Sequence, residues 1–205
     1  MNPRLHSFTG GSEGLWTVTG VRAAKGESLP NVDRLDVVNG ASTGAGAWVL
    51  RGVTSNERYA TQAEKSLLTA TQAPIGRAES THAALIPIRK SAAWWAMPQD
   101  ERRLILEEAS QHIRIGIKYL PGISRRLHHC RDLETAEPFD FLTWFDFAPH
   151  HAQAFEELVG QLRATEEWKF VDREIDIRLV REAPNFTADL RLSPASHAVS
   201  SVHGA

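Results

Sequence analysis

The order of hydrophobic and polar residues is most regular in the second half of the chain, where it predicts strand, helix, strand, strand, helix, strand. The first helix, over about residues 98–119, has apolar residues three and four positions apart, Pro98 with acids at its start, and Pro121 after its end. The predicted strands cover residues 84–90, 124–131, 139–147 and 171–179, and the second amphipathic helix covers residues 152–164. This is the split βαβ order of a ferredoxin-like unit.

The first half of the chain has a weaker version of the same order. Residues 16–21 and 47–53 alternate as strands, and residues 57–70 are expected to form a short helix. Pro87 indicates an edge or bulge position for the strand over residues 84–90. The pattern therefore predicts an α+β fold with two ferredoxin-like units whose sheets lie side by side.

His112 lies beside the apolar stripe of the first long helix and is expected to point inward. A buried imidazole needs a hydrogen-bond partner, and Gly116, one turn later, leaves space that a flat ring could use. The helix alone leaves two roles open. His112 is either a core histidine bonded to a backbone carbonyl, which is the commoner case, or a ligand.

Two strands carry a cation on the face that is expected to be buried. Arg125 lies between Ile123 and Leu127 in the alternation, and an inward arginine is costly unless it meets an anion or a carboxylate. The alternative for Arg125 is a salt bridge or a position at an edge, with its charge in water. Lys90 repeats the pattern on the preceding strand. Together with His112, these cations form a candidate site for an anionic ligand.

The run His128, His129 and Cys130 offers residue types that bind soft metals. On a strand the two histidines point to opposite faces, and no second ligand pair has zinc-finger spacing. A structural or surface role is therefore favoured for these residues.

The charge and the apolar content narrow the class of protein. A net charge of −2 over 205 residues argues against a general nucleic-acid or anionic-membrane partner. No stretch approaches the length of a membrane-spanning segment, and the first residues lack an apolar signal segment, so a cytoplasmic location is expected. Beyond Glu182 the chain is rich in small residues, and residues 183–205 are expected to form a loosely ordered C-terminal tail or to lie on a neighbour.

Several segments together closely resemble the haem-binding chlorite dismutase family. They are the run from Lys90 through Trp94-Trp95, and residues 110–116, 119–121, 125–131, 139–145, 163–168 and 173–179. The resemblance covers about the last two thirds of the chain. It implies one domain over residues 1–182, made of two ferredoxin-like halves (about 1–90 and 91–182) that form a dimeric α+β barrel.

The resemblance also implies a haem b with His112 as the axial ligand of the iron. Arg125 corresponds to the catalytic arginine on the other side of the ring. Glu167 corresponds to the glutamate that hydrogen-bonds the axial imidazole, with Glu166 as an alternative because residues 133–138 are slightly longer than in short members of the family. Without a C-x-x-C-H motif there is no c-type attachment, so the haem would be held non-covalently.

Three further residues have implied positions near the haem. Lys90 corresponds to a lysine in the network of the glutamate, and Trp94 and Trp95 correspond to two tryptophans near the haem. Without the resemblance, the tryptophan pair would be assigned to the hydrophobic core.

The activity that the resemblance implies is the conversion of chlorite to chloride and dioxygen, through a ferryl haem and a retained hypochlorite intermediate. The short N-terminal portion resembles the branch of the family that forms homodimers. Two alternatives stay open, a coproheme decarboxylase-like enzyme of haem synthesis and a non-catalytic haem-binding protein. The decarboxylase is disfavoured because it needs a tyrosine and lacks the distal arginine, whereas this chain has only Tyr59 and Tyr119 and carries Arg125.

Overall fold

Eight antiparallel strands form the frame of this computed structural model, which describes residues 4–42, 44–55 and 58–182. The strands are β1 (Leu5–Gly11), β2 (Trp16–Lys25), β3 (Arg34–Asn39), β4 (Trp48–Val53), β5 (His82–Lys90), β6 (Ile123–His129), β7 (Phe141–Phe147) and β8 (Val171–Val180). They close into a barrel in the order β1-β3-β2-β8-β5-β7-β6-β4. The predicted tail over residues 183–205 lies outside the described residues.

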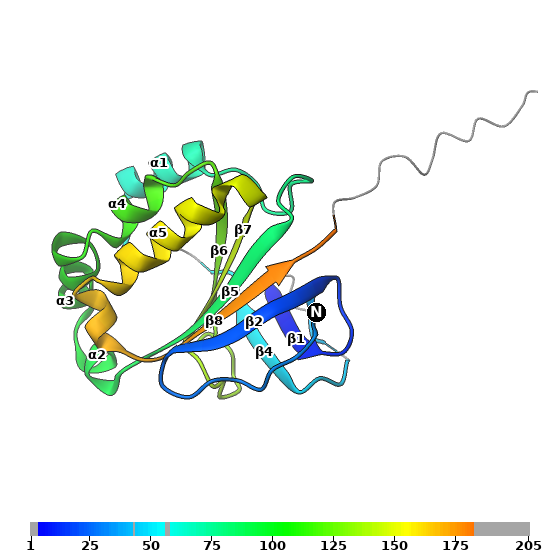
Figure 1. Ribbon diagram of the computed structural model, residues 1–205. Helices are drawn as coiled ribbons and strands as arrows, with labels where there is room; N and C mark the ends of the chain where they lie inside the picture. The colour runs from blue at the N-terminus through cyan, green and yellow to red at the C-terminus, as the bar shows by residue number, and fades with distance from the viewer. Residues whose placement is uncertain (1–3, 43, 56–57, 183–205) are drawn as a thin grey trace, which may run out of the picture.

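The helices gather on one side of the barrel, against the strands of the second half (Figure 1). They are the α-helices α1 (Gln62–Thr71), α2 (Ala92–Ala96), α3 (Gln99–Arg103), α4 (His112–Ile117) and α5 (Ala152–Arg163), the π-helix η1 (Leu104–Ala109), and the 3-10 helices η2 (Pro149–His151) and η3 (Glu167–Phe170). In the described part of the chain, no helix has the length and apolar character needed to cross a membrane.

Each half of the chain contributes four neighbouring strands in the same relative order. Numbered within its own half, that order is fourth, first, third, second, which gives β4-β1-β3-β2 and β8-β5-β7-β6. The second half also has the helices that the sequence pattern predicts between its strands. Among the described residues of the first half, no helix separates the four strands, and α1 follows them. The structure is therefore a mixed α+β fold with a closed barrel, without a complete ferredoxin-like unit in the first half.

The two halves meet at two joins of different length. Strand β2 pairs with β8 from Thr17, opposite Val180, to Lys25, opposite Glu174. Strand β4 pairs with β6 at one position, where Val53 lies opposite His129.

Two hydrophobic clusters lie on opposite faces of the second-half sheet, because successive side chains of a strand alternate. Ala83 and Leu85 of β5 belong to the cluster inside the barrel, and Ala84 and Ile86 belong to the cluster between the sheet and the helices. The inner cluster draws on strands around the barrel, with Phe8, Leu35, Leu50, Trp144 and Ile177 among its members. The outer cluster joins Phe145, Phe147, Phe155, Leu158 and Val159.

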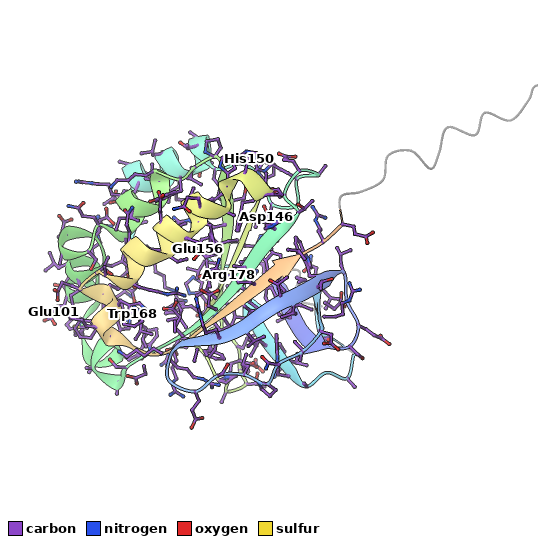
Figure 2. All side chains as sticks on the ribbon, viewed as in Figure 1. Glu101, Asp146, His150, Glu156, Trp168 and Arg178 are labelled. Carbon is purple, nitrogen blue, oxygen red and sulfur yellow. The ribbon has the colours of Figure 1, made fainter. Side chains whose placement is uncertain are left out.

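Helix α5 is also fixed to the sheet by ion pairs, one near the surface and one that reaches a buried aspartate. Arg178 of β8 forms an ion pair with Glu156 of α5, and Figure 2 shows these two side chains between helix and strand. Arg163 of α5 donates to Asp176 of β8 at 2.9 Å, and the Asp176 side chain is only 1% exposed. The helix is thereby held over the outer face of the sheet.

The prediction of one continuous helix over residues 98–119 is wrong. The segment consists of α3, η1 and α4, and Gln111 interrupts it with a left-handed backbone (φ 54°, ψ 34°). A left-handed residue cannot continue a right-handed helix, so a new helix begins at His112.

Of the two positions predicted for Pro87, edge or bulge, the edge is wrong, because β5 lies between β7 and β8. The pairing with β8 passes from Leu85 to Ile88, which leaves the proline, with no N–H group, between paired positions.

Candidate functional site

A cavity of about 780 Å³ lies between the outer face of the second-half sheet and the helices. Protein pockets that bind small molecules or cofactors typically measure about 300–1,000 Å³. Of the six residues that the family resemblance places at the site, five line it, namely Lys90, Trp94, His112, Arg125 and Glu167. Apolar side chains supply much of the remaining wall, among them Ile86, Ile88, Phe141, Phe145 and Leu158. The cavity can therefore hold a large apolar ligand against a few charged groups.

A chain of three charged or polar side chains forms one wall of this cavity. Nδ1 of His112 lies 2.5 Å from Oε2 of Glu167, and Nζ of Lys90 lies 2.6 Å from Oε1 of the same carboxylate. Because a carboxylate oxygen accepts, the imidazole donates from Nδ1, and when it is neutral its one proton is held there. Nε2 of His112 is then the nitrogen that is left to bind a metal.

The carboxylate of Glu167 stays ionised in this wall. Burial alone would raise its pKa, but the charges and hydrogen bonds of His112 and Lys90 outweigh burial and hold the pKa well below its ordinary value. A hydrogen-bonded anion behind an imidazole makes the opposite nitrogen a stronger electron donor.

Glu166 takes no part in this chain. Its side chain is 55% exposed and pairs with Lys169 at 2.6 Å on the surface. Of the two glutamates that the sequence left open, Glu167 is therefore the one that contacts His112.

Arg125 lies on the cavity face of β6, where its cross-strand neighbour is Phe145. Burial lowers the pKa of its guanidinium. Among the described residues no hydrogen bond or ion pair joins Arg125 to another side chain, so its charge is uncompensated there. A Cβ atom built on Gly116 would lie 2.9 Å from Nη1 of Arg125. The space that the sequence assigned to a flat ring beside Gly116 is thus occupied by this guanidinium.

The two tryptophans differ in their relation to the cavity. Trp94 lines it and is 1% exposed, with Nζ of Lys90 4.6 Å from the centre of its ring. Trp95 is not among the lining residues. Its Nε1 donates to Asp140 at 3.1 Å, and the same carboxylate oxygen accepts the backbone N–H of Lys90 at 2.7 Å. Contact between Trp95 and a cofactor stays a prediction.

Two side chains that the sequence pattern did not single out shape the turn before His112. The carboxylate of Glu107 accepts the backbone N–H groups of Ile113 at 2.7 Å and Arg114 at 3.3 Å. The hydroxyl of Ser110 accepts the backbone N–H of Glu167 at 2.8 Å. Both residues lie in a stretch that reads as continuous helix, so periodicity gave no signal for either role.

The metal interpretation of His128 and His129 gains no support. Nδ1 of His128 donates to the carbonyl of Leu142 at 3.1 Å, and burial lowers the pKa of the ring to about 3. His129 lines the cavity, and burial followed by the charge of Arg58 lowers its pKa to about 4. Within residues 4–42, 44–55 and 58–182, no group of three or more His, Cys, Asp or Glu side chains could hold a metal ion.

Comparison with known proteins confirms the family that the sequence resembles. The model of the chlorite dismutase family matches residues 33–182. The dimeric chlorite dismutase of Nitrobacter winogradskyi is 57% identical, with a TM-score of 0.81, over 86% of this chain and 99% of that one.

More distant relatives are similar over shorter segments. The imidazole complex of chlorite dismutase from Candidatus Nitrospira defluvii is 24% identical with a TM-score of 0.52, over 71% of this chain and 56% of that one, which supports the fold alone. The chlorite dismutase of Ideonella dechloratans is 30% identical over 88 residues, which are 43% of this chain and 28% of that protein. This match spans less than a third of the Ideonella protein.

Proposed function

Because this chain belongs to the chlorite dismutase family, we propose that it is a haem b-dependent chlorite dismutase, which converts chlorite to chloride and dioxygen. One observation carries the proposal. A single cavity is lined both by His112, whose Nδ1 is committed to a buried carboxylate, and by Arg125, whose cation lacks a partner among the described residues.

The residues of the cavity fit a haem. The volume of about 780 Å³, the apolar wall and the Nε2 atom of His112 that Glu167 leaves available are what a non-covalent haem requires. Haem b bound there would supply the iron that takes an oxygen atom from chlorite. Arg125 has no fixed partner among the described residues, so it can withdraw from Gly116 when a planar group enters.

On the side of His112, the protein controls the proton of the axial imidazole. Glu167 holds that proton at Nδ1, and Lys90 fixes the second carboxylate oxygen, so the imidazole gains anionic character. An imidazole of this kind favours the higher oxidation states of a metal that it binds.

On the other side, Arg125 acts on the anions of the reaction. Its guanidinium would draw chlorite into an apolar cavity, where a charge acts more strongly than in water, and would orient the anion by hydrogen bonds. It would then hold hypochlorite in the cavity until the oxygen–oxygen bond forms. Hypochlorite that escaped from Arg125 would instead oxidise nearby side chains, such as Trp94, which lines the same cavity.

The assembly belongs to the same proposal. We infer that residues 1–182 form one domain whose halves derive from ferredoxin-like units, because both contribute strands in the same relative order. The dimeric state of the Nitrobacter winogradskyi relative supports a homodimer.

Dioxygen release tests the activity. Haem-loaded protein is mixed with chlorite at an oxygen electrode, and rapid dioxygen evolution with a haem absorption band is the expected result. A haem-binding protein without turnover would give the band and no dioxygen. A decarboxylase would instead consume coproheme, and the tyrosine available for that reaction is Tyr59, which lines the cavity with its hydroxyl held by Arg102 at 2.8 Å.

A further inference from the structure

Glu107 lies one turn before the histidine of the site, outside the set of residues that the proposed function uses. We propose that Glu107 is a positioning residue for His112, which fixes the imidazole against Glu167 by holding the turn over residues 107–113. This inference rests on the proposed haem site and adds a residue that acts through another rather than on the ligand.

The turn is unusual because the chain changes helix type twice within it. The π-helix η1 ends at Ala109, and Gln111 has the left-handed backbone that ends the continuity of the segment. A non-glycine residue pays a conformational cost there and needs surrounding bonds to hold it. Glu107 supplies such bonds from both its backbone and its side chain. Its backbone carbonyl accepts the N–H of Gln111 at 2.8 Å, and its carboxylate accepts the two N–H groups that follow His112.

A carboxylate suits this position. Glu107 is 9% exposed and satisfies two backbone N–H groups that the start of α4 would otherwise leave unpaired. A glutamine could keep one acceptor, for the N–H of Ile113 at 2.7 Å, but its NH₂ group cannot accept the second N–H. An alanine would lose both bonds.

The same turn also holds the partner of His112. Ser110 accepts the backbone N–H of Glu167, so both ends of the 2.5 Å bond between His112 and Glu167 are fixed to residues 107–113. A hydrogen bond this short is sensitive to small displacements of either group. Loosening the turn should therefore weaken the bond that gives the imidazole its anionic character.

The experiment compares Glu107→Ala and Glu107→Gln with Glu108→Gln in the haem-loaded protein. Glu108 is the matched control because it is adjacent and acidic, but it is 65% exposed and faces Arg103 at 3.7 Å.

The measurements are the iron–histidine stretching band of the reduced protein and the rate of haem transfer to an acceptor protein. Replacement of residues that orient a metal ligand commonly weakens metal binding by about 10- to 100-fold, so Glu107→Ala should release haem at least about tenfold faster. Its iron–histidine band should fall in frequency.

Glu107→Gln should show the same changes to a smaller degree, and it decides the test if the alanine variant fails to fold. The control should match the wild type. An unchanged band and an unchanged release rate in the Glu107 variants would overturn the inference.

A readout without haem separates this inference from the proposed function. In the haem-free protein, the Nδ1 proton of His112 in its bond with Glu167 is followed by NMR. Glu107→Gln should shift this resonance and Glu108→Gln should not, and no shift in either would overturn the inference. Wild-type protein that takes up no haem would refute the proposed function while this NMR comparison still decides the role of Glu107.

Discussion

Replacing Lys90 by methionine should destabilise the haem-free protein by about 3–5 kcal/mol, because it leaves a buried carboxylate with one partner fewer. The side chains of Lys90 and Glu167 are 5% and 11% exposed, and their charged atoms lie 2.6 Å apart. Methionine keeps most of the volume, so the loss reports the charge. For a protein of this size, each kcal/mol lowers Tm by about 2–4 °C, which gives a fall of roughly 6–20 °C.

The matched control is Lys169→Met. Lys169 and Glu166 also lie 2.6 Å apart, but their side chains are 68% and 55% exposed, and such surface pairs contribute about 0–1 kcal/mol. Urea unfolding followed by circular dichroism measures both variants under the same conditions. Equal losses of less than about 1 kcal/mol in the two variants would refute the reasoning, because the pairs differ in burial rather than in distance.

A double-mutant cycle isolates the interaction itself. Adding Glu167→Gln to Lys90→Met removes the stranded charge, so the double variant should be more stable than the sum of the two single losses implies. The coupling free energy should be about 2–3 kcal/mol, at the upper end for residues in contact. Additive losses would show that Lys90 acts by packing, for example against the ring of Trp94.

The remaining predictions concern the haem site and the barrel. His112→Ala should abolish stable haem binding, and an unchanged Soret band would contradict this. Arg125→Ala should keep the haem but lower the dioxygen yield and hasten bleaching, and an unaltered yield per haem would count against retention. Glu167→Gln should raise the iron reduction potential, as a redox titration would show, because the imidazole loses anionic character. Burial lowers the pKa of His128 from 6.5 to about 3, so the unfolded chain binds the extra proton more readily. The contribution of His128 to the free energy of unfolding should be constant above pH 6.5 and fall toward pH 3, by up to about 5 kcal/mol. His128→Asn keeps a donor for Leu142 and should flatten this slope, and equal slopes in urea unfolding would contradict the assignment.

The sequence predicts the cavity faces of the strands well, because a strand has a fixed period of two. Arg125 and His129 of β6 and Lys90 of β5 line the cavity as their alternation predicts. A register error of one residue would have moved each of them to the opposite face. The two cations of the candidate site, Arg125 and Lys90, could therefore be predicted from the strand pattern, whereas Glu167 was implied only by the family resemblance.

The helix that carries His112 was harder to predict from the sequence, because an argument from helical periodicity assumes an unbroken helix. The π-helix η1 and the left-handed Gln111 change the rotation of the chain just before His112. His112 still points into the cavity, as the sequence predicts. The hydrogen bonds of Glu107 and Ser110, however, depend on the break in the helix and could not be predicted from periodicity.

Strand β1 was missed for a different reason. Strand β1 buries polar residues, with Ser7 donating to the carbonyl of Gly40 at 2.7 Å and Thr9 bonded to Ser42 at 2.9 Å. Such a strand shows no alternation of apolar and polar positions, because hydrogen bonds to other segments satisfy its polar side chains. These partners lie more than thirty residues away in the sequence.

The unequal joins between the two halves give the barrel a weak seam. Where strands share few backbone bonds, local opening costs less free energy than where they pair along their whole length. The join at Val53 and His129 should therefore open locally more often than the long join. The long join pairs β2, from Thr17 to Lys25, with β8. Because His129 lines the cavity, the join that opens more easily also forms part of the cavity wall, and its local opening would change the shape of the site.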